Sequence, residues 1–220
     1  MPDTPLPPAQ AGDRDSETPR LNRRQAAKVR TRQKVLEAAR TLFAERGYEP
    51  ATIRDIAKGA GMSTGAVFAN FQDKAELFEA VLTEDLLKLA ETVRTAADAE
   101  TSVRARLLAA LTAGYHGSMD QLPLVQAVVA RSWFQPVAAE THTRSAIKPL
   151  VRVVADTLQA GVQAGELRPD ADVRLLTELI YGAWLSNYRG AAYDGWTIEE
   201  MITRIGKQMD VILAGQISRQ

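Results

Sequence analysis

TIRDIAKGAGMSTGAVFANF, residues 52–71, joins two short apolar segments through a turn, and this stretch decides the fold around it. Two short helices that meet at a tight turn cross steeply, so a small residue must lie where they touch. Ala57 is that small residue, Gly61 supplies a turn position that tolerates positive φ, and Val67 places a hydrophobe on the second segment. The spacing predicts a helix-turn-helix corner.

Polar capping residues mark the starts of both helices. Thr52 begins the first helix with Asp55 three residues later, and Ser63 precedes a second helix of about 64–70. The second helix starts with small residues, which would let it approach base edges in the major groove of DNA. The alternative interpretation is a helical corner that binds no ligand.

Charge is unevenly distributed, although the formal net charge of the 220 residues is zero. Residues 20–77 contain 12 Lys and Arg against 6 Asp and Glu, a net charge of +6, while residues 1–19 and 78–220 carry −3 each. A basic segment in an otherwise mildly acidic chain is typical of a protein that binds a polyanion. A solvated charged face remains the alternative.

Composition excludes several classes of protein. The chain has no cysteine, which excludes disulfides, thiolate metal sites and cysteine nucleophiles and agrees with a reducing cytoplasm. No apolar run reaches the roughly 18 residues of a membrane span, and the N-terminus lacks the apolar core of a signal peptide. We therefore expect a cytoplasmic protein with no membrane partner. The proline-rich residues 1–19 are predicted to be a disordered tail.

Helical periodicity continues along the chain, and signals for β-strands are almost absent. An apolar stripe at 35–43 predicts a first helix closed by Gly47, and residues 77–93 mark a long helix of about two dozen residues. Further helices are predicted at about 101–118, 122–134, 146–164, 172–192 and 197–216. The predicted fold class is all-α, with a helix-turn-helix domain at 20–72 and a larger helical domain at 73–220.

The last two predicted helices are strongly apolar on one face. Such a face is most often plain core, but it also suits the self-complementary interface of a two-fold dimer. We predict a homodimer with an interface formed by Leu176, Ile180, Trp184, Ile198, Met201, Ile205 and Met209.

Residues 31–77 resemble the N-terminal domain of the TetR family, the tetracycline-repressor-like bacterial regulators. The resemblance is carried by VLEAARTLFAERGYEPATIRDIAKGAGMSTGAVFANFQDKAELF, while the later helices agree only in number, length and order. The positions in register are Ala39, Phe43, Gly47, Thr52, Ile56, Ala57, Ala60, Gly61, Ser63, Gly65, Phe71, Lys74 and Leu77. The resemblance implies a DNA-binding domain followed by a helical body that binds a small molecule and dimerises.

The resemblance also implies DNA contacts for individual residues. Arg54 would reach a base edge or a phosphate, and Thr52 and Lys74 would each bind phosphate. The start of the recognition helix that faces the groove would consist of Ser63, Thr64, Gly65 and Ala66.

Two positions depart from the family pattern. Phe68 stands where Tyr is common, and Asn70 stands where His or Tyr is common. Phe68 cannot donate a hydroxyl proton to a phosphate, whereas the amide of Asn70 can still form a hydrogen bond with one. We therefore expect the departures to affect local phosphate contacts and not the domain itself.

The basic run RLNRRQAAKVRTRQK precedes the predicted first helix. As an arm, this segment could lie over phosphates or place Arg23 or Arg24 in a minor groove. A flexible solubilising segment is the alternative interpretation.

Aromatic and adaptable side chains gather in the middle and later helices, where the resemblance implies a ligand cavity. An aromatic stripe at helical spacing is more often core than pocket, but an apolar or aromatic effector would suit these residues. The candidate pocket residues are Tyr115, His116, Met119, Trp133, Phe134, Tyr181, Trp184 and Tyr188.

No catalytic or metal-binding pattern is evident in the sequence. His116 and His142 are the only histidines, and neither has a metal-ligand partner at the usual helical spacing. Paired carboxylates, an activated serine and a glycine-rich phosphate loop are not evident either. We expect no enzymatic activity, no cofactor and no metal.

The first functional hypothesis is a homodimeric repressor that binds a palindromic double-stranded DNA operator and is released by a small molecule. Ligand binding would shift the fourth helix and thereby the spacing of the two recognition helices. The alternatives are a non-specific architectural DNA-binding protein and a small-molecule-binding module that no longer binds DNA.

Overall fold

The computed structural model describes residues 23–134 and 137–217. Within these ranges the chain is helical, with no strand beyond an isolated antiparallel bridge between Leu167 and Ile217, so the predicted all-α class is confirmed. The elements are α1 (Arg23–Arg46), α2 (Ile53–Gly59), α3 (Thr64–Phe68), α4 (Lys74–Asp98), α5 (Val103–Ser118), the 3₁₀ helix η1 (Met119–Gln121), α6 (Leu122–Phe134), α7 (Val137–Gln163), α8 (Val173–Asp194) and α9 (Ile198–Leu213).

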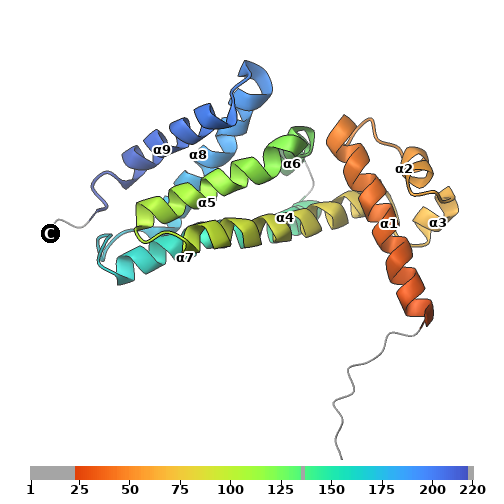
Figure 1. Ribbon diagram of the computed structural model, residues 1–220, viewed down its shortest axis with the longest axis horizontal. Coiled ribbons are helices and arrows are strands. Elements are labelled where there is room, and N and C mark those ends of the chain that lie inside the picture. The colour runs from red at the N-terminus through yellow and green to blue at the C-terminus, as the bar shows by residue number, and fades with distance from the viewer. Residues whose placement is uncertain (1–22, 135–136, 218–220) are drawn as a thin grey trace, which may run out of the picture.

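Helices α1, α2 and α3 form a small head at one end of the molecule (Figure 1). Their apolar side chains meet in one core, which the first turns of α4 complete with Leu77 and Phe78. The aromatic rings of Phe43, Tyr48 and Phe78 pack edge-on or tilted at the centre, with centroids 4.8 to 5.9 Å apart. The head therefore has a core of its own, which Leu124 of α6 joins from the larger set of helices.

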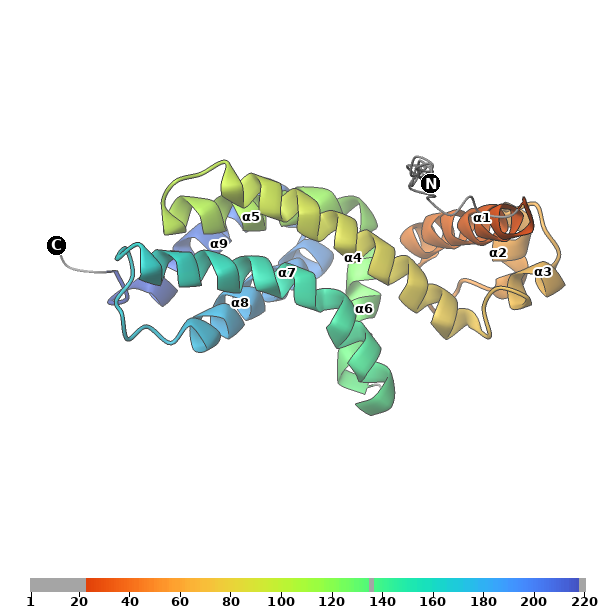
Figure 2. The same cartoon turned by 90° about the horizontal axis from the view of Figure 1, so that it is seen from below.

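The long helix α4 leads from the head into the rest of the molecule, which we call the body (Figures 1 and 2). In the body α4 packs along α5 and α7, and α8 packs on α7 and α9. Near its C-terminal end α4 buries Ala90, Val93 and Ala97 against these neighbours. One helix thus contributes to the cores of both head and body.

Two expectations about helix boundaries are wrong. The basic run is not an arm before the first helix, because residues from Arg23 onward are already helical in α1. Helix α7 begins at Val137 and continues through Pro149, whereas the prediction began it at 146. Proline in a helix interior removes a hydrogen bond and favours a kink, and Figure 2 shows α7 changing direction along its length. The predicted tail at 1–19 lies outside the described residues.

Candidate nucleic-acid interface and ligand cavity

The turn between α2 and α3 has the geometry that its sequence predicts. Gly61 has φ +66°, and the backbone N–H of Met62 donates to the carbonyl of Ala57 over 2.9 Å. Ser63 then caps α3, since its Oγ accepts a hydrogen bond from the backbone N–H of Ala66 over 3.2 Å. A side chain at position 61 would strain this left-handed backbone, so the corner depends on glycine.

Buried side chains attach α3 firmly to the head. Val67 and Phe71 lie in the head core with Phe43 and Ile56, and each is at most 2% exposed. The opposite side of α3 faces solvent, with Thr64 and Gly65 exposed. The prediction of a short helix with small residues at its exposed start is therefore confirmed as geometry.

Phe68 is the largest apolar side chain on the exposed side of α3. Its side chain is 55% exposed, so packing in the head does not explain it. Arg54 on α2 is also exposed, whereas Ala66 is half-buried beneath the start of α3. These residues give the head a polar surface of small side chains with one arginine and one aromatic ring.

Two predicted phosphate-binding residues already use their polar groups inside the head. The hydroxyl of Thr52 donates to Oδ2 of Asp55 over 2.7 Å and accepts from the Asp55 backbone N–H. The side-chain N–H of Asn70 donates to the carbonyl of Ala66 over 2.9 Å, while Oδ1 of Asn70 is buried without a partner among the described residues. A phosphate contact through the hydroxyl of Thr52 would have to replace its bond to Asp55, whereas the amide of Asn70 keeps a second N–H for one.

Lys74 is oriented into the head, which contradicts the expectation that it meets a phosphate in this conformation. Its ammonium donates to the carbonyls of Tyr48, Glu49 and Ala51 over 3.0 to 3.2 Å, and it lies 4.2 Å from the centroid of the Tyr48 ring. An ammonium has three donors, so these carbonyls satisfy all of them. In this structure Lys74 fastens the loop after α1 to the start of α4.

Arg32 supports the recognition helix, and sequence reasoning did not single it out. Its Nη1 donates to the carbonyl of Asn70 over 3.0 Å, and its guanidinium lies 4.1 Å from the centroid of the Phe71 ring. One of the basic residues of the predicted arm thus fixes the end of α3. The side chains of Arg23 and Arg24 lie outside the described residues.

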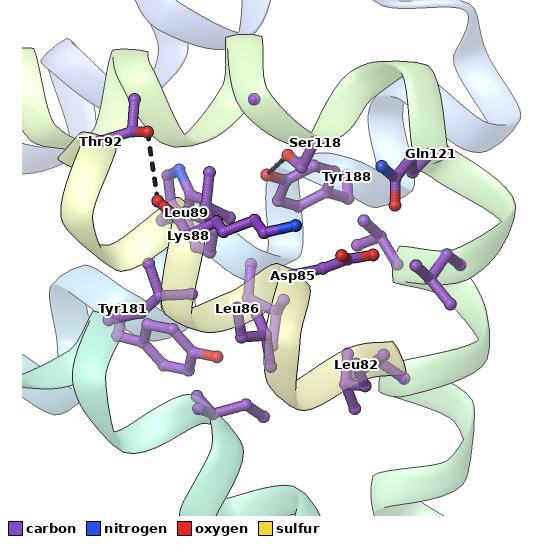
Figure 3. Close-up of a pocket in the computed structure, with 18 residues that line it drawn as sticks. Leu82, Asp85, Leu86, Lys88, Leu89, Thr92, Ser118, Gln121, Tyr181 and Tyr188 are labelled. Carbon is purple, nitrogen blue, oxygen red and sulfur yellow. Dashed lines mark hydrogen bonds between the residues drawn. The ribbon is translucent and has the colours of Figure 1, made fainter. Parts of the chain in front are cut away.

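A cavity of about 280 Å³ lies in the body between α4, α5, α6, α7 and α8 (Figure 3). Its wall is mostly apolar, and this volume is near the lower end of small-molecule sites. Of the predicted pocket residues, Tyr181, Trp184 and Tyr188 line it. The cavity therefore lies beside three of the aromatic residues that were predicted to line a pocket.

The other predicted pocket residues lie elsewhere. Tyr115 is fully buried beside the cavity and stacks on Trp184 with ring centroids 5.6 Å apart, so it belongs to the core. His116 is exposed, and Met119 packs against the body core without lining the cavity. Helical periodicity could not separate these positions from the true lining. The side chains of Trp133 and Phe134 lie outside the described residues.

The aromatic wall of the cavity is supported by buried hydrogen bonds. Ser118 and Tyr188 share a hydrogen bond between their hydroxyls, and Nε1 of Trp184 donates to the carbonyl of Leu111 over 3.0 Å. Burial raises the pKa of the Tyr188 hydroxyl above its ordinary value and that of Tyr181 to about 12. Both phenols are therefore neutral near pH 7 and can act as hydrogen-bond donors.

Comparison with known proteins identifies relatives of this chain. The family model described as "Bacterial regulatory proteins, tetR family" matches residues 35–81. The HTH-type transcriptional repressor KstR2 of Mycolicibacterium smegmatis is 31% identical over 159 residues, which cover 70% of this chain and 77% of that relative. The chain belongs to the TetR family.

Two further relatives show how the similarity to other TetR-family proteins is distributed. The HTH-type transcriptional repressor AcnR of Corynebacterium efficiens is 51% identical over 65 residues, but the match covers only 30% of this chain and 35% of AcnR, about a third of that relative. The solved structure of KstR2 from Mycobacterium tuberculosis superposes with a TM-score of 0.56 at 27% identity, covering 86% of this chain and 95% of that one. Over a short stretch identity is high, while the fold agrees over most of the chain.

In this TetR-family chain, an ion-pair cluster joins the head to α4, and sequence reasoning did not find it. Arg40 on α1 donates through Nε to Oδ1 of Asp85 over 2.7 Å and through Nη2 to Oε2 of Glu84 over 2.9 Å. Burial lowers the pKa of the Arg40 guanidinium, but the hydrogen bonds and charges of Asp85 and Glu84 outweigh burial and raise it. The partners are more than 40 positions apart in sequence, so no local pattern could reveal them.

The predicted dimer residues are mostly buried inside the chain's own body. Leu176, Ile180 and Trp184 on α8 and their counterparts on α9 form the body core, and of the seven only Ile198 is partly exposed. That face is core, since one side chain cannot fill its own protein's core and also contact a second copy. The apolar residues that remain exposed on these helices are Leu175, Leu179, Tyr193 and Val211.

Two further observations concern metals and membranes. Within residues 23–134 and 137–217, no group of three or more His, Asp or Glu side chains is placed to hold a metal ion. No helix in the described part of the chain is both long enough and apolar enough to cross a membrane.

Proposed function

We propose that this chain is a transcriptional repressor that binds double-stranded operator DNA through α3 and is released by an apolar small molecule. The observation that carries the proposal is the capped, small-residue start of α3, exposed on a firmly packed head within a segment of net charge +6. A helix of this kind can enter the major groove with its first residues at the base edges.

Residues on α2 and α3 have different roles in this proposal. Thr64 and Gly65 allow close approach, and Arg54 supplies a guanidinium that can reach a base or a phosphate. Phe68 offers an apolar ring, which fits beside a thymine methyl group. Phosphate contacts by Thr52 and Lys74 require a rearrangement of the hydrogen bonds they make in the head, whereas Asn70 retains a second amide N–H.

A homodimer accounts for operator binding better than a monomer, because one recognition helix reads few bases. The exposed side of α8 and α9 supports such a dimer, since Leu175, Leu179 and Val211 are each about half or more exposed. Burial of this apolar side against its two-fold copy would place two heads on a palindromic site. A DNA partner also implies a cytoplasmic location.

The cavity is the proposed effector site. Its apolar wall favours an apolar ligand, and the relative KstR2 is known as a "ketosteroid transcriptional regulator", which names an apolar class of compound for that protein. The cavity touches α4, the helix that also enters the head. A ligand that binds one position of α4 more tightly than another would change DNA affinity.

The experiment that tests this function is a binding footprint with DNA from upstream of the protein's own gene. The expected result is protection of a palindromic site, with specific DNA binding about a thousandfold tighter than random duplex at the same salt. Equal affinity for both would indicate non-specific architectural binding. No binding and no dependence on salt would favour a module that binds only small molecules.

Arg54→Ala sharpens the same experiment. If Arg54 contacts a base, the substitution weakens operator binding by about 1–3 kcal/mol and relaxes specificity at one position. Arg152→Ala is the matched control, because Arg152 is an exposed arginine on α7 in the body. An equal loss on operator and random DNA would contradict the base contact.

A further inference from the structure

The cavity in the body reaches the edge of the head. Leu82 on α4 and Leu124 on α6 line the cavity, and both also belong to the core cluster of the head. Asp85 lies one turn after Leu82 and lines the same cavity, while its carboxylate binds Arg40 of α1. The cavity wall is therefore continuous with the ion-pair cluster that joins head and body.

The carboxylate of Asp85 is only half satisfied. Oδ1 accepts the hydrogen bond from Arg40 over 2.7 Å, whereas Oδ2 is buried and has no hydrogen-bond partner among the described residues. The side chain is 17% exposed and Oδ2 is buried, so a ligand in the cavity reaches this oxygen only when the carboxylate turns toward it. A buried charged oxygen without a donor is unfavourable, and a ligand that supplies a donor gains what the protein lacks.

Other polar groups on the wall do not meet this need. Ser118 and Tyr188 bond to each other, and Lys88 forms no ion pair with Asp85 in the described part of the chain. Lys88 lines the cavity from the next turn of α4, but its side chain is exposed (Figure 3). The hydroxyl of Tyr181 has no hydrogen bond to any described residue, so it is a further unpartnered polar group on a mostly apolar wall.

We propose that the effector has an apolar body and a hydrogen-bond-donating head group, a hydroxyl or an ammonium, which binds Oδ2 of Asp85. The proposal rests on the effector site proposed above and names the chemical class of its ligand. A ketone or a carboxylate at this position would place lone pairs against the lone pairs of Asp85 and would be rejected.

In this assignment the single negative charge of the Asp85 carboxylate is shared by two partners, Arg40 and the donor group of the ligand. A donor at Oδ2 competes with Arg40 for that charge, and an ammonium competes more strongly than a hydroxyl. Glu84 also binds Arg40 but does not line the cavity. The ion pair between Arg40 and Glu84 would therefore keep α1 attached to α4 when Asp85 turns toward the ligand. Ligand binding and the attachment of the head to α4 are thus linked through one residue.

The test uses the full chain and four probes with the same apolar chain: octan-1-ol, octylamine, octan-2-one and octanoate. Binding is followed by tryptophan fluorescence, to which Trp184 in the cavity wall contributes, and by calorimetry. Octylamine and octan-1-ol are expected to bind about tenfold or more tightly than octan-2-one and octanoate, because a hydrogen bond to a charged group contributes about that factor.

Two variants identify the residue responsible. Asp85→Asn is expected to abolish the preference for donors, since its amide can donate as well as accept. Glu84→Gln is the matched control, because it changes the same ion-pair cluster outside the cavity, and it should keep the preference. Tighter binding of octanoate by the unaltered chain would show that Lys88 selects an anion and would overturn the proposal, as would an unchanged preference in Asp85→Asn.

The outcomes also separate this proposal from the proposed function. If donors are preferred through Asp85 but no probe changes operator affinity, the ligand assignment stands and ligand-released repression fails. If probes release DNA without regard to their head group, the repressor function stands and the role of Asp85 fails. Absence of binding by all four probes, in a chain shown to be folded by circular dichroism, would overturn the assignment of the cavity as a donor site.

Discussion

The first turns of α4 and its middle differ in how completely they are packed. In its first turns Leu77, Phe78 and Val81 are at most 1% exposed and close the core of the head. Just beyond them, Asp85, Leu86 and Leu89 border the cavity, and one oxygen of Asp85 has no partner among the described residues. A sealed core resists rearrangement, whereas a cavity can be filled by a ligand. The contrast places a rigid core where α4 enters the head and a space that a ligand could fill beside its middle.

The largest effect on this contrast is expected from Phe43→Ala. Removing a fully buried ring from a core with no space to spare should lower the free energy of unfolding of the head by about 3–5 kcal/mol. Tyr181→Phe is the control at the cavity, where the lost hydroxyl has no partner among described residues, and it should change stability by about 0.5 kcal/mol or less. Urea denaturation measures both, and similar losses would remove the distinction between the two ends.

Arg40→Gln tests the ion-pair cluster that joins the head to the middle of α4. The loss of the guanidinium leaves Asp85 and Glu84 close together without their cation, so stability should fall by about 2 kcal/mol. Arg174→Gln is the matched control, since Arg174 pairs with Glu178 but its side chain is 90% exposed. That change should cost about 0.5 kcal/mol or less. Equal thermal shifts for the two variants would show that the Arg40 cluster does not hold the head.

Lys74→Gln distinguishes two roles for Lys74, a hydrogen-bond donor within the head and a phosphate contact on DNA. Since the ammonium binds three carbonyls of the head, the variant should lose about 1 kcal/mol of stability. The slope of log affinity against log salt for DNA should stay unchanged, because Lys74 neutralises no phosphate in this conformation. A slope reduced by about 1 would restore the DNA contact that the family resemblance implies and would show that Lys74 reorients on DNA.

The smallest effect is expected from Phe68→Tyr. A hydroxyl on this exposed ring can donate to a phosphate, so affinity should rise by about 0.5–1 kcal/mol on operator and random DNA alike. Gel-shift titrations at fixed salt measure the change, with Tyr193→Phe on an exposed ring of α8 as a control outside the head. Reduced binding to the operator alone would indicate that the unmodified ring contacts a thymine methyl.

Sequence patterns located most helices of both head and body, and they missed one helix start in each. The corner at Gly61, the cap at Ser63 and the buried face of α3 all depend on neighbours within a few residues, so they could be predicted. The start of α1 was missed because a basic run carries no apolar stripe, although it can be helical. In α7, tertiary packing of the helix tolerates Pro149, which sequence rules treat as a helix breaker.

Residues that act across long separations could not be predicted in the same way. Helical periodicity shows that one side of α8 is apolar, but it does not distinguish the body core from a dimer interface, and Leu176 and Ile180 proved to be core. Periodicity likewise placed Tyr115 with Tyr181, although only Tyr181 lines the cavity. Only the tertiary structure shows which side of α8 and α9 remains exposed, because the other side is covered by the chain's own helices.

The amino-acid sequence by itself determined the helix-turn-helix corner, the basic character of its surroundings and the all-α class, because capping, glycine φ and apolar spacing act over a few residues. Only the tertiary structure decided where the cavity lies, that Lys74 is oriented inward, and that Arg40 meets Asp85. These features depend on which helices pack side by side, and burial of apolar side chains from distant parts of the chain drives that packing. Local pattern therefore specified the DNA-binding corner, and global packing specified how a ligand could act on it.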